Sequence, residues 1–307
     1  MTLTLESYFR KTSETPTYRS FGDTASHKII AIFDKTPPSI VCPHFWELRW
    51  AYGCPYDCAY CYLKGTFYGK KDPRFPYTIN QIEKTINTTF QKLADPQIFN
   101  SGELSDSLMN PDLMTKIADI FENQSKHKLL ILTKSNNVDF LVKKPRKQTI
   151  VSFSLNASTP AKLWENRAPD PLRRIEAAKS VSDVGYETRI RIDPIFPTDN
   201  WRDEYNDIIY AIISAFTPDR ITLGTPRGLL KTIRFSADTS WTKYFGENSG
   251  WGKKIPENLR KEIYEFHINK LNDLSFDKSR IALCKETKEM WHVLGLDCTN
   301  IRCNCVW

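Results

Sequence analysis

Apolar residues recur along the chain in two alternating patterns, short continuous runs and helical spacing. The run Leu129–Thr133 is typical of a strand buried on both faces. Leu172, Ile175, Ala178 and Val181 instead recur at the spacing of one helix face. Because the two patterns alternate, the chain is expected to fold as consecutive β–α units.

Six such units can be read from the sequence. Strands are predicted at Glu47–Tyr52, Pro96–Ser101, Leu129–Thr133, Thr149–Leu155, Thr188–Ile192 and Arg220–Leu223. Helices are predicted after the first five strands at residues 78–93, 112–123, 136–142, 170–185 and 203–216. Strands alternating with helices favour an α/β fold with a parallel sheet, closed in part as a (β/α)6 TIM-like barrel. In such folds the chemistry lies at the carboxyl ends of the strands.

Three domains or segments are predicted. Residues 1–46, with Pro37-Pro38, form an extended N-terminal lead-in, residues 47–225 the core barrel, and residues 226–307 a small cysteine-rich C-terminal extension. Within the last segment, residues 225–256 are irregular and rich in glycine, which predicts a long functional loop or lid.

Composition narrows the class of protein. The 307 residues are 40% hydrophobic and 26% charged, and no apolar run reaches the roughly 18 residues of a membrane span. With no signal-peptide core at Met1–Arg10, we expect a cytoplasmic protein with no membrane partner, where thiols stay reduced. The eight cysteines are therefore expected to be metal ligands or catalytic groups. A net charge of +7 favours a polyanionic partner such as nucleic acid, or reflects an ordinary solvated surface.

Three cysteines, Cys54, Cys58 and Cys61, follow the first predicted strand at a C-x3-C-x2-C spacing. Three thiolates on a short loop can hold three irons of a 4Fe-4S cluster and leave the fourth iron without a protein ligand. An iron that is open in this way can bind and activate a small molecule.

This triplet, with an aromatic residue before the third cysteine (Tyr60), resembles the radical S-adenosylmethionine (radical SAM) superfamily. The resemblance covers roughly residues 47–225. It implies a partial (β/α)6 barrel, SAM bound at the open iron, and a 5′-deoxyadenosyl radical that removes hydrogen from a substrate. It further implies contacts to SAM from residues at the strand ends: Gly102, Glu103, Lys134, Ser154 and Asn156. Simple polar lining of the barrel mouth is the alternative for these residues.

Within the superfamily, the segments Leu132-Thr133-Lys134 and Phe153-Ser154-Leu155-Asn156 resemble the spore photoproduct lyase-like group. That resemblance implies a hydrogen or electron relay through Tyr60 and Tyr62. The lyase carries a cysteine hydrogen donor near the end of its second strand, whereas this chain has no cysteine in Ser101–Asp106. Cys42 could replace that thiol, or it could be a buried packing residue.

Four further cysteines lie in the last 24 residues: Cys284, Cys298, Cys303 and Cys305. A second iron–sulfur cluster could use all four, and a structural zinc could as well. The single residue between Cys303 and Cys305 is unusual for zinc, where two to four intervening residues prevail. The third possibility is that these four cysteines bind no metal.

Two other features bear on the substrate. Arg189 and Arg191 alternate along the fifth strand, so both face one side and could hold a carboxylate or phosphate, or form an ion pair inside the barrel. Aromatic residues gather in the late loop and could stack on nucleic acid or cap the open barrel: Trp241, Tyr244, Phe245 and Trp251.

The sequence thus predicts a radical SAM enzyme that acts on DNA or RNA, by lesion repair or base modification. A flavodoxin or ferredoxin is the expected reductant. Two alternatives remain, a radical SAM enzyme for a peptide, protein or small metabolite, and a non-catalytic iron–sulfur or zinc-binding module.

Overall fold

The computed structural model of the chain describes residues 20–21, 29–70, 72–250 and 252–307. Their centre is a nine-stranded sheet with the order β1-β2-β4-β5-β6-β7-β8-β9-β12. The seven strands from β4 to β12 run parallel, and β1 and β2 extend the first edge antiparallel. The strands are β1 (Ser20–Phe21), β2 (Ile30–Phe33), β4 (Phe45–Leu48), β5 (Ile98–Asn100), β6 (Lys128–Thr133), β7 (Thr149–Leu155), β8 (Glu187–Ile192), β9 (Arg220–Leu223) and β12 (Ile281–Leu283).

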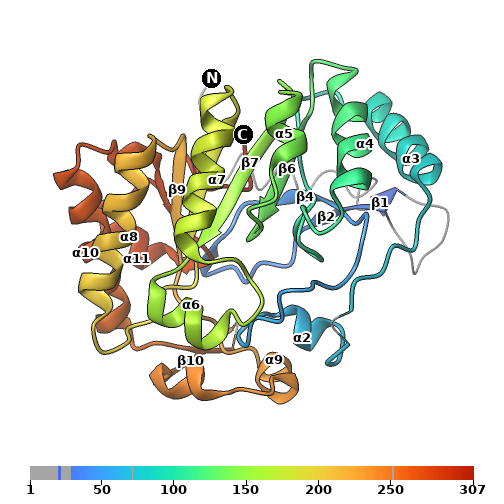
Figure 1. Ribbon diagram of the computed structural model, residues 1–307. Helices are drawn as coiled ribbons and strands as arrows, with labels where there is room; N and C mark the ends of the chain where they lie inside the picture. The colour runs from blue at the N-terminus through green and yellow to red at the C-terminus, as the bar shows by residue number, and fades with distance from the viewer. Residues whose placement is uncertain (1–19, 22–28, 71, 251) are drawn as a thin grey trace.

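Helices connect the parallel strands and cover the outer side of the sheet, with α3 and α4 at one end and α8 and α10 at the other (Figure 1). They are α2 (Leu63–Thr66), α3 (Ile79–Lys92), α4 (Pro111–Glu122), α5 (Asp139–Lys143), α6 (Ser158–Trp164), α7 (Pro171–Asp183), α8 (Trp201–Ala215), α9 (Leu230–Phe235), α10 (Glu257–Asp273) and α11 (Lys288–Val293). Because β4 to β9 follow one another in both sequence and space, the predicted six β–α units and partial barrel are confirmed.

Local sequence signals set several helix starts. Thr78 accepts from the Gln81 N–H, and the Gln81 side chain accepts from the Thr78 N–H, which forms the capping box expected for α3. Asn110 and Asp170 likewise accept hydrogen bonds from the first turns of α4 and α7, each ahead of a proline. These three predicted starts are confirmed within one residue.

The N-terminal lead-in is part of the sheet where it is described. β2 pairs antiparallel with β4, and β3 (Ile40–Val41) pairs with β13 (Glu286–Thr287). The pairing of β3 with β13 joins the segment that precedes β4 to the C-terminal extension. The rest of the predicted lead-in, residues 1–19 and 22–28, lies outside the described residues.

The segment predicted as an irregular loop is ordered. It contains α9, a 3-10 helix at Ser240–Tyr244 and a hairpin of β10 (Glu247–Ser249) and β11 (Gly252–Lys254). Gly65 of α2 packs so closely on α9 that a Cβ there would lie 2.8 Å from the Thr232 nitrogen.

The aromatic side chains of this segment face inward. Trp241 is fully buried in a cluster with Trp164 and Phe196, and Tyr244 and Phe245 pack against it. Trp241 is therefore not free to stack on nucleic acid. Tyr244 and Phe245 are only half-buried, so stacking of these two rings on nucleic acid stays a prediction. Trp251 lies outside the described residues.

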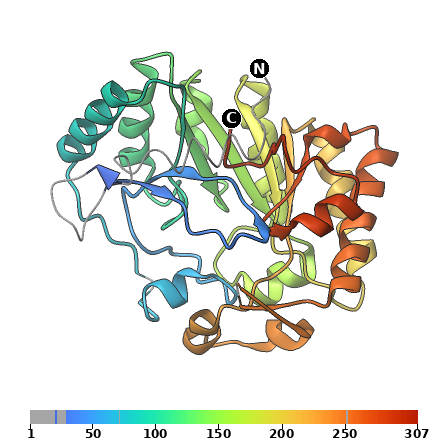
Figure 2. The same cartoon turned by 180° about the vertical axis from the view of Figure 1, so that it is seen from behind.

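The C-terminal tail folds back onto the inner side of the sheet (Figure 2, dark red). The fully buried Asn304 donates to Ser152 Oγ of β7 (2.7 Å) and to the Ile190 carbonyl of β8 (3.0 Å), and accepts from Thr222 Oγ1 of β9 (2.7 Å). Arg189, which was predicted to face the same side of the strand as Arg191, donates to the carbonyls of Asn304 and Val306. Its role is thus to hold the tail.

None of the helices in the described ranges is both long and apolar enough to span a bilayer.

Candidate functional site

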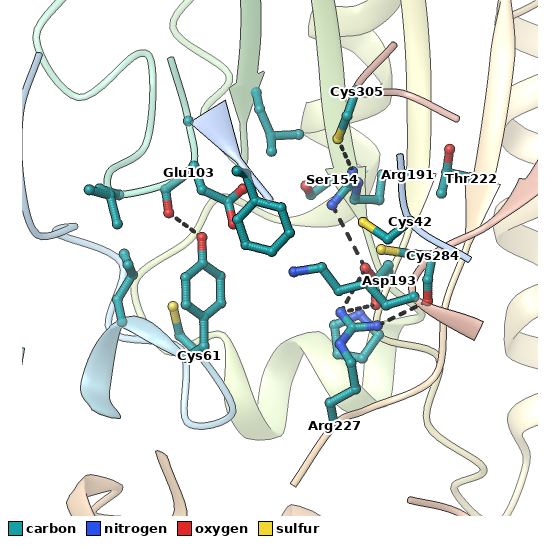
Figure 3. A pocket seen from close by; sticks show the side chains of 18 of the residues that line it. Cys42, Cys61, Glu103, Ser154, Arg191, Asp193, Thr222, Arg227, Cys284 and Cys305 are labelled. Carbon is teal, nitrogen blue, oxygen red and sulfur yellow. Dashed lines mark hydrogen bonds and ion pairs between the residues drawn. The ribbon is translucent and has the colours of Figure 1, made fainter. Parts of the chain in front are cut away.

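A cavity of about 550 Å3 opens at the carboxyl ends of the parallel strands (Figure 3). Its lining combines the loop after β4, the ends of β5, β6, β7 and β8, and the last cysteines of the chain. Cys61 lies on one side of it, and Cys42, Cys284 and Cys305 lie on the other (Figure 3). We call these sides the loop wall (the wall that carries Cys54, Cys58 and Cys61) and the tail wall (the wall that carries Cys42, Cys284, Cys303 and Cys305).

The cysteine loop is fixed to the barrel through its backbone. Gly53 N–H donates to the Leu104 carbonyl (3.0 Å), and Ala59 N–H donates to the Trp164 carbonyl (2.8 Å). Asp57 takes a positive φ of 53° and its carboxylate is paired with Lys64 at 2.5 Å. These contacts hold the loop in a turned conformation beside the strand ends.

All three cysteines of the loop line the cavity. Burial raises the pKa of each thiol, and the neighbouring loop cysteines raise the pKa of Cys54 and Cys58 further. The thiolates therefore need a cationic group among them. In the described ranges, no three His, Cys, Asp or Glu side chains converge on a single ion. A cubane cluster takes each thiolate on a different iron, and three cysteines on one loop that line the same cavity fit a 4Fe-4S cluster.

Behind the loop wall lies a buried charge network centred on Glu165. Its carboxylate accepts from the Tyr60 hydroxyl and from Arg174 Nη2 (2.6 Å), and lies 3.4 Å from the Lys134 ammonium. Burial alone would raise the pKa of Glu165, but Lys134 and Arg174 with these hydrogen bonds lower it to about 2. The sequence contains no signal for Glu165, because this residue follows helix α6, whereas functional residues were expected at the ends of strands.

Asn156 belongs to this network rather than to the cavity lining. It is fully buried, donates to Glu165 Oε1 (3.2 Å) and accepts from the Tyr205 hydroxyl (2.6 Å). The side chain predicted to contact the ribose of SAM thus lies behind the wall and orients Glu165. Ser154, which lies two residues earlier, on β7, does line the cavity.

The end of β5 supplies the next part of the lining, including Gly102 and Glu103. A Cβ on Gly102 would lie 2.6 Å from the Leu132 carbonyl oxygen, so only glycine fits there. The Tyr62 hydroxyl donates to the Glu103 carbonyl, and burial raises the pKa of both Tyr60 and Tyr62 well above the usual value. Both tyrosines therefore stay protonated.

Asp106, to which the sequence assigned no role, is buried beside the end of β6. It accepts from Thr133 Oγ1 (2.7 Å) and from the Lys134 backbone N–H (2.8 Å). Burial raises its pKa in spite of these hydrogen bonds. Asp106 thereby fixes the backbone that carries Lys134 into the cavity.

The tail wall brings together Cys42, Cys284, Cys303 and Cys305, all of which line the cavity. Cys298 does not line it, so the structure separates this residue from the other three predicted C-terminal ligands. Cys42 takes its place in the wall, although its sequence position indicated no such location. Burial raises the pKa of Cys42 to about 12 and that of Cys284 to about 11.

Arg191 lies among these thiols, with its Nη2 donating to Cys305 Sγ at 3.1 Å. Arg227 Nη2 binds Asp193 at 3.0 and 3.1 Å, and Arg191 Nη1 lies 3.8 Å from the same carboxylate. Burial would raise the pKa of Asp193, but Arg227 and Arg191 lower it. Arg191 lines the cavity, and its partners there are a carboxylate and a thiol.

Comparison with known proteins gives a consistent result. The family model described as spore photoproduct lyase matches residues 29–224. The spore photoproduct lyase of Clostridium acetobutylicum is 25% identical over 260 residues, 77% of this chain and 75% of that protein. The enzyme of Bacillus subtilis is 26% identical over 192 residues, 61% of this chain and 55% of that protein.

A solved structure of a spore photoproduct lyase variant with bound AdoMet and dinucleoside spore photoproduct has a similar fold. Its TM-score is 0.67 at 19% identity, over 83% of this chain and 79% of that one. Three cysteines of the tail wall, Cys284, Cys303 and Cys305, lie outside the residues that the family model matches.

Proposed function

The chain belongs to the spore photoproduct lyase family, a family of radical SAM enzymes, and on this premise we propose that it repairs a DNA lesion of the spore photoproduct type. In this proposal Cys54, Cys58 and Cys61 hold the catalytic 4Fe-4S cluster. When bound there, the cluster supplies the electron that breaks the sulfonium bond of SAM. The remaining residues of the cavity bind and orient SAM and the lesion.

The observation that carries the proposal is the three-thiol loop wall beside a cavity of about 550 Å3. A volume of this size can hold a cofactor and part of a substrate side by side. Strand-end residues line the cavity between the loop wall and the tail wall, so SAM and the lesion could both bind there.

Lys134 is proposed to bind the carboxylate of SAM. The buried Glu165 carries one negative charge, whereas Lys134 and Arg174 together carry two positive charges. The network therefore retains one unit of positive charge at the cavity, where a carboxylate would be stabilised. Glu103 is proposed to accept from the SAM amino group, and Ser154 to bond to its ribose.

Tyr60 and Tyr62 are proposed to flank the reacting groups. Each hydroxyl is held by an acceptor, Glu165 for Tyr60 and the Glu103 carbonyl for Tyr62. A phenol that is fixed and protonated can pass a hydrogen atom without moving its ring. This supports the relay implied by the resemblance to the lyase.

A DNA lesion is preferred to other substrates because the relatives are named for it and because the chain carries a net charge of +7. RNA base modification is the nearest alternative. The alternative, a peptide, protein or small-metabolite substrate, would be favoured by an auxiliary iron–sulfur cluster at the C-terminal cysteines.

That second cofactor stays a prediction. Three of its four predicted ligands line the tail wall, and Cys298 does not. The guanidinium of Arg191 lies among the thiols, and a cation in their centre disfavours a Zn2+ ion there by charge repulsion. A flavodoxin or ferredoxin as reductant and a cytoplasmic location likewise stay predictions.

The test is an anaerobic assay of the reconstituted, reduced enzyme with SAM and dinucleoside spore photoproduct. We expect 5′-deoxyadenosine to form faster with the dinucleoside than without it, and the two thymines to be restored. If SAM is cleaved but the lesion persists, the radical chemistry stands and the proposed substrate is wrong. If SAM is neither bound nor cleaved, the non-catalytic alternative replaces the proposal.

A further inference from the structure

Two arginines at alternate positions of β8 differ in how fully they are hydrogen-bonded. Arg189 donates four hydrogen bonds, two to Glu187 and two to carbonyls of the tail. Arg191 donates to Cys305 Sγ, a weak acceptor, and its Nη1 lies 3.8 Å from Asp193, beyond hydrogen-bond distance. The Nε–H of Arg191 is buried and has no acceptor among the described residues. Arg189 therefore holds the structure together, whereas Arg191 keeps donors that a ligand can use.

Arg191 faces the cavity beside the proposed SAM site. In the parallel sheet it lies in register with Ser154 of β7 on one side and Thr222 of β9 on the other. All three residues line the cavity, and Figure 3 shows Arg191 between the other two. Neighbouring strands are about 4.8 Å apart, so a group bound by Arg191 lies about one strand away from the ribose that Ser154 is proposed to bind.

The cavity lining on this side is positively charged. At the ends of β8, β9 and β12 the charged lining residues are Arg191, Asp193, Arg227 and Lys285. Three positive charges and one negative charge give a formal net charge of +2. At the ends of β5 and β6 the charged lining residues are Glu103, Asp106 and Lys134, with a formal net charge of −1. The side of the cavity around Arg191 therefore favours an anion.

The carboxylate of SAM does not account for this charge. It is proposed to bind Lys134, which follows β6, and β7 lies between β6 and β8. Two strand spacings, about 10 Å, thus separate Lys134 from Arg191. The anion at Arg191 is therefore a second one, and the substrate has to supply it.

We propose that Arg191, together with Arg227 and Lys285, binds the phosphate group that joins the two nucleosides of the lesion. This inference rests on the proposed function and names the part of the substrate that the tail wall binds. A guanidinium donates two parallel hydrogen bonds to a phosphate, and a phosphate oxygen is a stronger acceptor than the Cys305 sulfur that it replaces. Asp193 binds Arg227 Nη2 at 3.0 Å and keeps that guanidinium at the cavity.

The test compares two substrates that differ by this phosphate, the dinucleotide form of the spore photoproduct and the dinucleoside form. For the reconstituted, reduced wild type we expect a KM for the dinucleotide roughly tenfold or more below that for the dinucleoside. Arg191→Gln should bring the ratio of the two KM values close to one. Arg191→Lys keeps the charge without the planar fork and should retain part of the ratio. Equal KM values in the wild type, or an unchanged ratio in Arg191→Gln, would overturn the proposal.

Arg202→Gln is the matched control, because it removes the same charge at a surface position. Arg202 pairs with Glu262, is about half exposed and lies outside the cavity lining. This variant should keep the wild-type ratio, and an equal loss of the ratio in Arg202→Gln would contradict the assignment to Arg191. Inorganic phosphate should raise the KM for the dinucleotide and leave that for the dinucleoside unchanged. If it raises both equally, it binds elsewhere and the assigned site is wrong.

Direct binding separates failure of this inference from failure of the proposed function. If the wild type repairs neither substrate, binding of inorganic phosphate to the reconstituted protein is measured by isothermal titration calorimetry. Arg191→Gln should weaken this binding roughly tenfold. Asp193→Asn leaves both arginines without their counter-charge and should strengthen it.

The opposite directions of these two shifts distinguish the site from a damaged fold, which would weaken binding in both variants. Absence of binding by the wild type, weaker binding in both variants, or wild-type binding in both would overturn the inference.

Discussion

The two walls of the cavity present thiols in different ways. The loop wall takes Cys54, Cys58 and Cys61 from one continuous loop, whereas the tail wall combines Cys42 with three cysteines from the last 24 residues. The loop wall also lies within the residues that match the lyase family, and most of the tail wall lies beyond them. The loop cysteines could therefore be recognised from their spacing in the sequence. The arrangement of the four tail-wall cysteines around one cavity could not, because only folding brings Cys42 to the other three.

The supports of the walls differ as well. Behind the loop wall is an ionic network centred on Glu165. The tail wall is held by hydrogen bonds of the neutral Asn304 side chain together with those of the Arg189 and Arg220 guanidinium groups. Charged partners can tune a bound cofactor, whereas amide and hydroxyl partners mainly fix a position. The support of the loop wall is thus centred on a carboxylate, and that of the tail wall on an amide.

The largest expected effect comes from removing a thiol of the loop wall. We expect Cys58→Ala to abolish cluster assembly and SAM cleavage, because the remaining two thiols cannot hold the cubane in place. Cys305→Ser should retain the loop-wall cluster. Iron and sulfide content with the visible absorption spectrum measure both variants, and SAM cleavage by Cys58→Ala at the wild-type rate would contradict the assignment.

Next in size is the effect of neutralising the network behind the loop wall. Glu165→Gln leaves Arg174 and Lys134 without their counter-charge, and loss of one partner of a buried pair costs about 3–5 kcal/mol. Urea denaturation at neutral pH measures this loss in the free energy of unfolding. The control is Asp183→Asn, which removes an exposed ion pair with Lys179 and should cost about 0–1 kcal/mol.

The same variant gives a pH signature. Because the pKa of Glu165 is lowered from 4.5 to about 2 on folding, its charge stabilises the folded state fully above pH 4.5 and loses this contribution as the pH falls toward 2. The contribution at neutral pH is about 3 kcal/mol. The stability gap between wild type and Glu165→Gln should therefore shrink between pH 4.5 and 2, and a gap independent of pH would contradict the ionic network.

The smallest effect is expected from the support of the tail wall. Asn304→Ala removes hydrogen bonds to Ser152, Ile190 and Thr222 and should cost about 1–3 kcal/mol in the free energy of unfolding. Asn300→Ala, at an exposed position of the same tail, is the control and should change little. If Asn304→Ala costs no more than Asn300→Ala, the hydrogen bonds of Asn304 do not hold the tail on the sheet and the contrast between the walls fails.

Local signals in the sequence predicted much of this molecule. The caps at Thr78, Asn110 and Asp170 fixed helix starts, because a cap acts through hydrogen bonds within a few residues. The alternation of Arg189 and Arg191 indicated that they share one side of the strand, and both contact the C-terminal tail. Asn156 was expected at the cavity, but its amide is used by Glu165 and Tyr205, partners that no local pattern indicates.

The late aromatic segment shows the opposite limit. Its glycines and rings indicated an irregular loop, yet Trp241 packs on Trp164 and Phe196 from two earlier parts of the chain. Burial of a large ring depends on the surface that it meets, which the sequence of the loop itself does not contain.

The sequence alone determined the β–α order, the helix starts and the three-thiol loop, since each depends on contacts between residues close in the chain. Tertiary structure decided which remote groups meet in the cavity: Glu165 behind Lys134, Cys42 in place of Cys298, and the tail plugged into the sheet by Asn304. These placements depend on burial and hydrogen bonding between segments that are not neighbours in the chain, as in the contact of Asn304 with Ser152.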